Sequence, residues 1–271
     1  MKIKLPIIVS LFLLLVSCGK PSGNGEIIEA SGTIEATEVN VSAKMGGQIE
    51  SMKGREGDWI KYGDTLAVID HATLELQLRQ AQAGWELARI QYESDSRDDQ
   101  RTADLLQKGS INQKLRDDAN TRYKVSKVKM EQARVVMDLV RKSISDCYIT
   151  APAKGVITNT NFEPGETIGP GSVLHTISKL DTVEITVYVS EKELGYVKLS
   201  QTAEIRTDSY NNKIYPGKVV YISSEAEFTP KNIQTKQDRV KQVFGVKIEV
   251  PNSDQDLKPG MPADAVIIAK G

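Results

Sequence analysis

Residues that could do chemistry are few and scattered in this chain of 271 residues. Its thiol and imidazole groups belong to Cys18, Cys147, His71 and His175. Their wide spacing forms neither a disulfide framework nor a set of zinc ligands. The sequence also contains no nucleophile elbow, P-loop or HExxH motif. We therefore expect no enzyme, no catalytic residue, no metal site and no cofactor.

Cys18 is the one residue whose surroundings indicate a specific reaction. Two lysines, Lys2 and Lys4, precede the apolar run 5–16, which is shorter than the roughly 20 residues that a membrane-spanning helix needs. This pattern is typical of a secretory signal peptide. The letters LVSCG at 15–19 then match the bacterial lipobox, in which the cysteine thiol is diacylated and becomes the new N-terminus. We expect lipidation at Cys18; the alternative is an ordinary signal peptide with a chance cysteine.

The remaining three side chains indicate packing rather than reactivity. Cys147 follows the acidic Asp146, whereas a reactive thiol needs basic neighbours that lower its pKa. We expect Cys147 to be a small buried residue. His71 and His175 are expected to be structural or exposed rather than metal ligands.

An internal repeat organises the chain. Segments 43–69 and 151–177 align with a constant offset of 108 residues and no gap. The first copy shares eight identical positions with the second: Ala43, Gly47, Ile49, Gly57, Ile60, Gly63, Leu66 and Ile69. Each copy predicts short strands separated by glycine turns. We expect the two copies to pack face to face with pseudo-twofold symmetry.

The segment between the two copies has a helical pattern. It contains no proline, and its only glycines are Gly84 and Gly109. Apolar residues spaced by three and four predict a coiled-coil seam on two arms. The first arm carries Leu74, Leu78, Ala81, Trp85, Ala88 and Tyr92, and the second carries Val125, Val128, Gln132, Val135 and Leu139.

The break between the arms predicts an antiparallel hairpin. Gly109 suits the left-handed position that follows a helix. Asn112 suits the N-cap of the next helix, where its side chain would accept the N–H of Lys114 or Leu115. Each arm would have about 35 residues and a length of roughly 50 Å.

The repeat resembles the lipoyl/biotinyl half-motif, a flattened barrel of two small sheets. In carrier proteins of that fold a tight hairpin joins the halves and presents the lysine that carries biotin or lipoate. Here the helical segment takes the place of that hairpin, and Lys44 lies inside the first half. A carrier-type protein is therefore the less favoured alternative.

The C-terminal part reads as strands. Val183, Ile185, Val187 and Val189 alternate with more polar residues, as in a half-buried strand. The segment 190–200 predicts a short helix. The letters LKPGMPA at 257–263 predict a turn before the last strand. The sequence ends soon afterwards, so we expect any membrane-proximal domain to be truncated or absent.

A lipid anchor, a split lipoyl motif and a helical hairpin at the split together resemble the HlyD-like periplasmic adaptor, or membrane fusion, proteins of efflux pumps and exporters. The LKPGMPA letters are similar to the signature of the family's small β-barrel, and with segment 239–244 they resemble ABC-exporter-associated adaptors most. The resemblance implies an α+β fold: a lipoyl/biotinyl-like β-sandwich split by a long antiparallel α-helical coiled-coil hairpin, followed by a small β-barrel. The expected order is a lipoprotein signal peptide at 1–17, a tether at 18–26, a leading strand and first half-motif at 27–70, the hairpin at 71–146, the second half-motif at 147–180 and the β-barrel domain at 181–271.

The resemblance also implies a function and its partners. Adaptors of this family are non-catalytic and bridge an inner-membrane transporter, here favoured as ABC type, and a TolC-like outer-membrane channel. It implies a hexamer in the complex and a place in the periplasm of a Gram-negative bacterium, with a lipid anchor favoured in the inner membrane. The nearly balanced charges, 35 Lys+Arg against 36 Asp+Glu, argue against a nucleic-acid partner. A structural coiled-coil lipoprotein that acts only as a spacer is the other alternative.

Family members with a funnel-type partner carry three channel-docking residues at the hairpin tip: an Arg, a Leu four residues later and a Ser seven further on. Arg101, Leu105 and Asn112 hold these spacings, with Asn in place of Ser. The alternative for the three is a surface arginine, a seam leucine and an N-cap.

Overall fold

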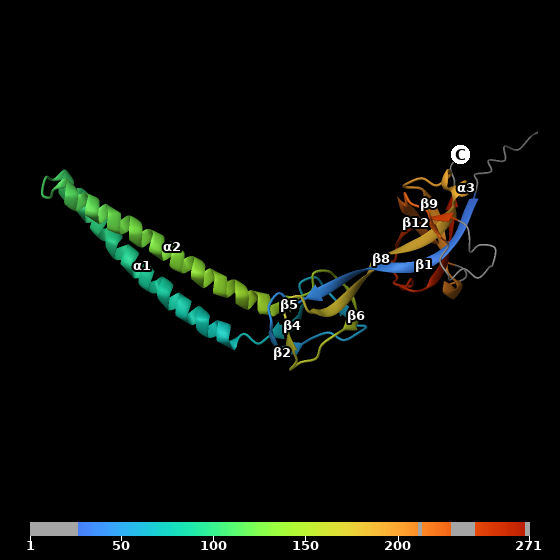
Figure 1. The fold of residues 1–271 in the computed structure, drawn as a ribbon, viewed down its shortest axis with the longest axis horizontal. Helices are drawn as coiled ribbons and strands as arrows, with labels where there is room; N and C mark the ends of the chain where they lie inside the picture. Colours follow the sequence, from blue (N-terminus) through green and yellow to red (C-terminus); the bar gives the residue numbers. More distant parts are fainter. Residues whose placement is uncertain (1–26, 211–212, 229–241, 269–271) are drawn as a thin grey trace, which may run out of the picture. The chain divides into compact units, whose positions relative to one another are not determined.

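The computed structural model describes residues 27–210, 213–228 and 242–268 (Figure 1). The expected signal peptide, Cys18 and the tether lie outside these residues. The chain forms two compact units. One contains residues 33–185 and 250–261, and the other contains the described residues of 27–32, 186–249 and 262–268. The long strands β1 (Ile27–Ser42) and β8 (Val173–Ser190) contribute to both units.

The first unit contains a β-sandwich. One sheet has the order β5-β4-β2-β7, with β2 at Gly47–Met52, β4 at Thr65–Ile69, β5 at Tyr148–Thr150 and β7 at Thr167–Ile168. The other layer is the run β1-β8-β6-β3, with β3 at Trp59–Ile60 and β6 at Gly155–Thr160. The core is almost entirely aliphatic and includes Val41, Ile49, Leu66, Ile69, Ile149, Ile157, Leu174 and Ile177.

The two repeat copies exchange equivalent hydrogen bonds across the sandwich. The N–H of Gly57 donates to the carbonyl of Ile157, and the equivalent Gly165 donates to Ile49, both at 2.8 Å. A second pair of turns repeats the exchange, with Gly63 donating to Ala151 at 2.9 Å and Gly171 donating to Ala43 at 2.8 Å. The turn glycines also match in φ: +93° at Gly57 and Gly165, +85° at Gly63 and +87° at Gly171. The pseudo-twofold arrangement predicted from the 108-residue offset is confirmed.

The helical hairpin replaces a tight turn between two paired strands. Strands β4 and β5 are antiparallel neighbours, with Ala67 opposite Ile149 and Val68 opposite Tyr148. Between them the chain forms α1 (Ala72–Gln107, 36 residues) and α2 (Gln113–Cys147, 35 residues). Figure 1 shows the two helices lying side by side over their length. The lipoyl-like sandwich with a helical hairpin at its split, as expected from the sequence, is confirmed.

The turn between the helices has the predicted chemistry. Gly109 has φ +70°, and the N–H groups of Gly109 and Ser110 donate to the carbonyls of Leu106 and Leu105 at 2.9 Å each. This is the hydrogen-bond pair of a Schellman motif. On the other side the Asn112 Oδ1 accepts the N–H of Leu115 at 2.9 Å. The turn therefore satisfies the carbonyls of Leu105 and Leu106 at the end of α1 and the N–H of Leu115 at the start of α2.

The seam predicted for α1 is confirmed, but the seam predicted for α2 is wrong. Val128 and Leu139, expected in contact with α1, are 67% and 63% exposed. The less exposed positions of α2 follow a different heptad pattern: Ala119, Tyr123, Ser126, Met130, Ala133, Met137, Val140 and Ile144. The helix carries two heptad patterns, and α1 covers only one of them. The pattern that α1 covers includes the small residues Ala119, Ser126 and Ala133.

The second unit is a small β-barrel. Strands β9 (Thr202–Arg206), β10 (Tyr215–Ile222), β12 (Gln242–Pro251) and β13 (Pro262–Ile268) join parts of β1 and β8. Their order is β12-β10-β9-β13-β1-β8, and the pairing of β8 with β12 closes the ring. The short β11 (Glu227–Phe228) pairs with β12, and a single 3₁₀ turn lies at Asp208–Tyr210. Closure leaves fewer exposed sheet edges.

Two local predictions for this part have different outcomes. The alternating residues Val183, Ile185, Val187 and Val189 of β8 are all buried, as expected. The helix expected at 190–200 is shorter and covers only α3 (Glu191–Leu194). It ends because Gly195 follows and the next N–H groups make turn hydrogen bonds instead of continuing the helical ladder.

Candidate functional site

The hairpin tip presents two of the three predicted docking residues on one face of α1. Arg101 and Leu105 are four residues apart, so they lie one turn apart on that face. The Arg101 side chain is 71% exposed, and its Nη1 lies 3.6 Å from Asp98 Oδ1. This single exposed pair leaves most guanidinium donors available. Leu105 is half-buried, and its carbonyl accepts the Ser110 N–H that closes the turn.

Asn112 lies across the turn at the start of α2 and has two separable roles. Its Oδ1 caps the helix by accepting the Leu115 N–H. The residue is exposed, and its side-chain NH₂ can donate outwards. The structure therefore brings Arg101 and Leu105 together and places Asn112 at the N-cap that its residue type predicts.

A polar contact just below the tip holds the two helices in register. The Asp99 carboxylate accepts hydrogen bonds from the Arg116 guanidinium and, at 3.0 Å, from the Asn120 Nδ2. Both partners of the ion pair are largely buried, and the hydrogen bond from Arg116 lowers the pKa of Asp99. Sequence reasoning missed this contact. The available signal was an acidic residue at a seam position of α1, level with a basic one on α2.

The aromatic pair Tyr92–Tyr123 lies further along the seam, beyond the buried Asp95, with ring centroids 5.7 Å apart. Below it the seam of α1 becomes apolar. We infer that the tip is rigid. A Schellman turn closes the end of α1, an N-cap closes the start of α2, and the Asp99–Arg116 ion pair joins the two helices.

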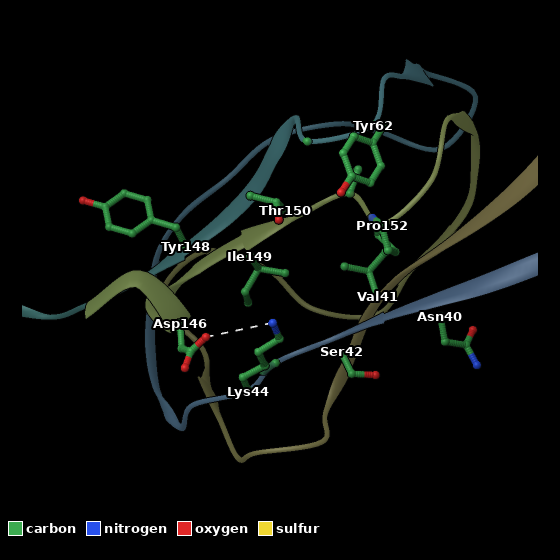
Figure 2. A pocket seen from close by; sticks show the side chains of 13 residues that line it. Asn40, Val41, Ser42, Lys44, Tyr62, Asp146, Tyr148, Ile149, Thr150 and Pro152 are labelled. Carbon is green, nitrogen blue, oxygen red and sulfur yellow. Dashed lines mark ion pairs between the residues drawn. The ribbon is translucent and has the colours of Figure 1, made fainter. Parts of the chain in front are cut away.

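A second candidate is an open groove in the β-sandwich, drawn in Figure 2. It has a volume of about 600 Å³ and is lined by the end of β1, the turn at Tyr62 and strand β5. Figure 2 shows Lys44 pointing toward Asp146, with Nζ 3.9 Å from Oδ1. The groove contains no nucleophile with an adjacent base. Lys44 lies in its wall, whereas a carrier lysine would lie at the tip of a tight hairpin.

The cysteine and the histidines are placed as structural residues. Cys147 ends α2, is buried and donates from Sγ to the Ser143 carbonyl at 3.4 Å; burial, with Asp146 and Asp70 nearby, raises the pKa of the thiol. His175 is buried, and its Nδ1 lies 3.1 Å from Thr160 Oγ1; burial lowers the pKa of its imidazole. His71 pairs through Nε2 with Tyr148 Oη at 3.1 Å.

Two features are absent from the residues that the structure describes. Within residues 27–210, 213–228 and 242–268, no three His, Cys, Asp or Glu side chains are grouped so that they could hold a metal ion. Over the same ranges, no helix combines the length and the apolar character that crossing a membrane requires.

Comparison with known proteins gives two family matches. The RND MFP barrel-sandwich hybrid domain matches residues 37–179, and the YknX-like beta-barrel domain matches residues 183–267. Among curated proteins, the UPF0194 membrane protein YbhG of Salmonella typhimurium is 28% identical over 283 aligned positions, which cover 85% of this chain and 86% of that protein.

Solved structures with the same fold include two with close agreement in backbone. The membrane fusion protein Spr0693 of Streptococcus pneumoniae matches with a TM-score of 0.67 and 17% identity, over 90% of this chain and 100% of that one. MacA of Actinobacillus actinomycetemcomitans matches with a TM-score of 0.69 and 22% identity, over 90% of this chain and 78% of that one.

Proposed function

The chain belongs to the membrane fusion protein family, and from that premise we propose that it bridges an inner-membrane transporter and an outer-membrane channel as the periplasmic adaptor of an efflux or export system. It would catalyse no reaction; its work would be to hold two membrane proteins together. The observation that carries the proposal is the hairpin itself. Two helices of 36 and 35 residues replace a tight turn and end in a fixed tip with an exposed arginine.

We favour an ABC-type transporter and a TolC-like channel as the two partners. The support for the transporter class is the LKPGMPA sequence of the barrel, which resembles that of ABC-exporter-associated adaptors. The support for the channel is the spacing of Arg101, Leu105 and Asn112 at the tip.

Two alternatives account for less of the molecule. A spacer lipoprotein needs only a coiled coil. It would not explain why the chain also contains a β-sandwich whose two repeat copies exchange equivalent hydrogen bonds. A carrier protein needs a lysine on a tight hairpin, and that hairpin is replaced here by α1 and α2. Reactivity of the purified protein with streptavidin or an anti-lipoate antibody would favour the carrier.

Isolation of the complex tests the proposal. The tagged protein, recovered from detergent-solubilised envelopes, should bring with it one transporter of the inner membrane and one channel of the outer membrane. A protein that is recovered alone, as a monomer or dimer, would favour the spacer.

We also propose that Cys18 carries the membrane anchor. Cys18→Ser should leave a soluble or unprocessed form, because the thiol that accepts the acyl chains is gone and each buried CH₂ contributes about 0.8 kcal/mol to membrane binding. Metabolic labelling with palmitate measures the modification directly. If the wild-type protein takes up no label, Cys18 does not carry an anchor. We favour the inner membrane as the membrane that holds the anchor.

Within the complex we propose a hexamer in the Gram-negative periplasm. The mass of the assembled complex should then contain six copies of this chain.

A further inference from the structure

One end of the β-barrel carries exposed apolar side chains from four separate segments. Their exposed fractions run from 40% at Val220 to 63% at Ile27. We call the set the barrel-end patch; it consists of Ile27 of β1, Tyr196 and Leu199 in the turn after α3, Val220 and Tyr221 of β10, and Ile268 of β13.

Hydrogen bonds hold the turn after α3 against two of the strands. The Gln201 Nε2 donates to the carbonyl of Ile268 at 2.8 Å and to the carbonyl of Tyr196 at 3.3 Å. The N–H of Ser200 donates to the carbonyl of Val219 at 2.8 Å. These bonds place Tyr196 and Leu199 beside the end of β13 and beside the outward-facing residues of β10.

The register of β1 against β13 adds Ile27 to the same surface. The two strands are neighbours in the sheet. The Ser31 Oγ donates to Asp264 Oδ1 at 2.6 Å, and the Ile34 N–H donates to the Met261 carbonyl at 2.9 Å. Both pairs have residue numbers that sum to 295, as in an antiparallel pair, so Ile27 lies opposite Ile268. Figure 1 shows α3 and the start of β1 at the same end of the barrel.

The turn after α3 presents Leu199 to solvent in a fixed backbone conformation. Val197 is buried, whereas Leu199 is 62% exposed. The next residue, Ser200, has φ +68°, a left-handed value that residues other than glycine seldom adopt. Such backbone strain persists only where the surrounding contacts fix it, and it is concentrated at functional sites. An exposed leucine beside it indicates a binding surface.

The apolar surface is confined to the end of the barrel. On the outer face of β1, Ile27 is followed by the exposed Glu29 and then by Ser31, which is bonded to Asp264. A strand rises about 3.3 Å per residue, so polar groups begin roughly 7 Å from Ile27. Interfacial helices enter a bilayer to a similar depth, about 5–10 Å.

We propose that the barrel-end patch docks on the lipid surface beside the acyl anchor. The inference rests on the proposed lipidation of Cys18, which lies nine residues before Ile27. Nine residues span at most about 30 Å when fully extended. The end of the barrel at which β1 begins is therefore tethered close to the bilayer. A short tether gives an effective concentration in the millimolar range, so a weak patch is sufficient.

The residue types of the patch suit a lipid surface. Tyrosine is enriched at membrane–water interfaces, because its ring is apolar and its hydroxyl is polar; Tyr196 and Tyr221 are both half exposed. The charges nearby nearly cancel, since Lys192 and Lys198 accompany Glu191 and Glu193. The contact should therefore be mainly apolar and should need neither anionic lipid nor low salt. Its effect would be to fix which end of the barrel faces the membrane.

A fluorescent label at position 199 tests the contact in the full-length anchored protein. Leu199→Cys, labelled with an environment-sensitive dye, is reconstituted into phosphatidylcholine vesicles that contain no other protein. The native Cys147 is buried, and the proposed lipid occupies Cys18. Emission should shift to shorter wavelength and be quenched by spin-labelled lipid, because the dye enters the headgroup region.

Ile214→Cys is the matched control for the label. Ile214 is 50% exposed and directly precedes β10, so it lies at the opposite end of that strand from Val220 and Tyr221. Six residues of strand correspond to about 20 Å, and a label at 214 should show neither the shift nor the quenching. Equal signals at the two positions, or no shift at 199, would overturn the contact. So would a shift at 199 that appears only when the transporter is added, since the patch would then belong to the transporter.

A second pair of substitutions tests whether Leu199 itself contributes. With the dye on Tyr196→Cys, Leu199→Asp should abolish the shift and Ile214→Asp should preserve it; a shift that survives Leu199→Asp would also count against the patch. Circular dichroism verifies that both exposed substitutions leave the fold intact. If palmitate labelling shows no acyl chain, the anchor and this contact fail together. An anchored protein whose label at 199 stays in water overturns the contact alone. Recovery of the transporter and the channel tests bridging independently of both.

Discussion

Arg101→Asp or Leu105→Ser should abolish export while the protein remains folded and anchored. In the structure Arg101 makes only one exposed ion pair, with Asp98, so its replacement should change the free energy of unfolding by no more than about 0.5 kcal/mol. At the channel the same change would replace up to five hydrogen-bond donors by a negative charge. Leu105→Ser removes the apolar side chain that we propose fills a groove between partner helices. Export assays with circular dichroism as the folding control measure both effects.

Asn112 provides the matched comparison at the same tip. Asn112→Ala should weaken export and also cost about 1 kcal/mol of stability, because the cap to Leu115 is lost. Asn112→Ser keeps a capping oxygen and should retain export. If folded Arg101→Asp and Leu105→Ser proteins export at the wild-type rate, the tip does not dock as proposed.

Gly155→Ala should have a large effect on stability, because it forces apart two strands of the sandwich. A Cβ at this position would lie 2.3 Å from the Ser178 carbonyl oxygen and 2.7 Å from the Ile177 side chain. Strands β6 and β8 are paired there, so backbone must move. We expect a loss of about 3 kcal/mol, seen as faster hydrogen exchange in peptides from β6 and β8.

Gly84→Ala is the opposite substitution and serves as the control. No atom lies within 4 Å of a Cβ at Gly84, and alanine in a helix interior is favoured over glycine by about 1 kcal/mol. Exchange in α1 should therefore slow down while the sandwich is unaffected. Unchanged exchange in Gly155→Ala would mean that β6 and β8 do not approach each other as closely as the structure has them.

Much of the fold could be predicted because its signals are local or repeated. The 108-residue offset predicts the symmetric sandwich, since Gly57 and its equivalent Gly165 must adopt the same left-handed turn. Gly109 and Asn112 predict the hairpin turn, because each satisfies the backbone groups at its own helix end. These inferences need no knowledge of which surfaces finally meet.

The seam of α2 could not be predicted, because it depends on which surfaces of the two helices finally meet. Periodicity identifies the more apolar face of a helix but not the neighbour that covers it. Val128 and Leu139 are more apolar than Ser126 and Tyr123, which pack against α1 at the true seam. The Asp99–Arg116 pair was missed because its two residues belong to different helices, and only the register brings them together.

The docking role of Arg101, Leu105 and Asn112 remains a prediction, because it concerns contacts with a second protein. The structure supplies their surroundings: an exposed arginine, a half-buried leucine and an N-cap on a fixed turn. Lipidation at the lipobox, residues 15–19, also remains a prediction, because the described residues begin at 27.

Isolation of the complex with the wild-type protein and with Arg101→Asp, side by side, tests the bridging function most directly. The tagged wild-type protein should bring both the inner-membrane transporter and the outer-membrane channel out of solubilised envelopes. The Arg101→Asp protein should bring the transporter in equal amount and lose the channel, because only the tip is changed. Recovery of neither partner by the wild type, or equal recovery of the channel by both proteins, would contradict an adaptor that reaches its channel through this tip.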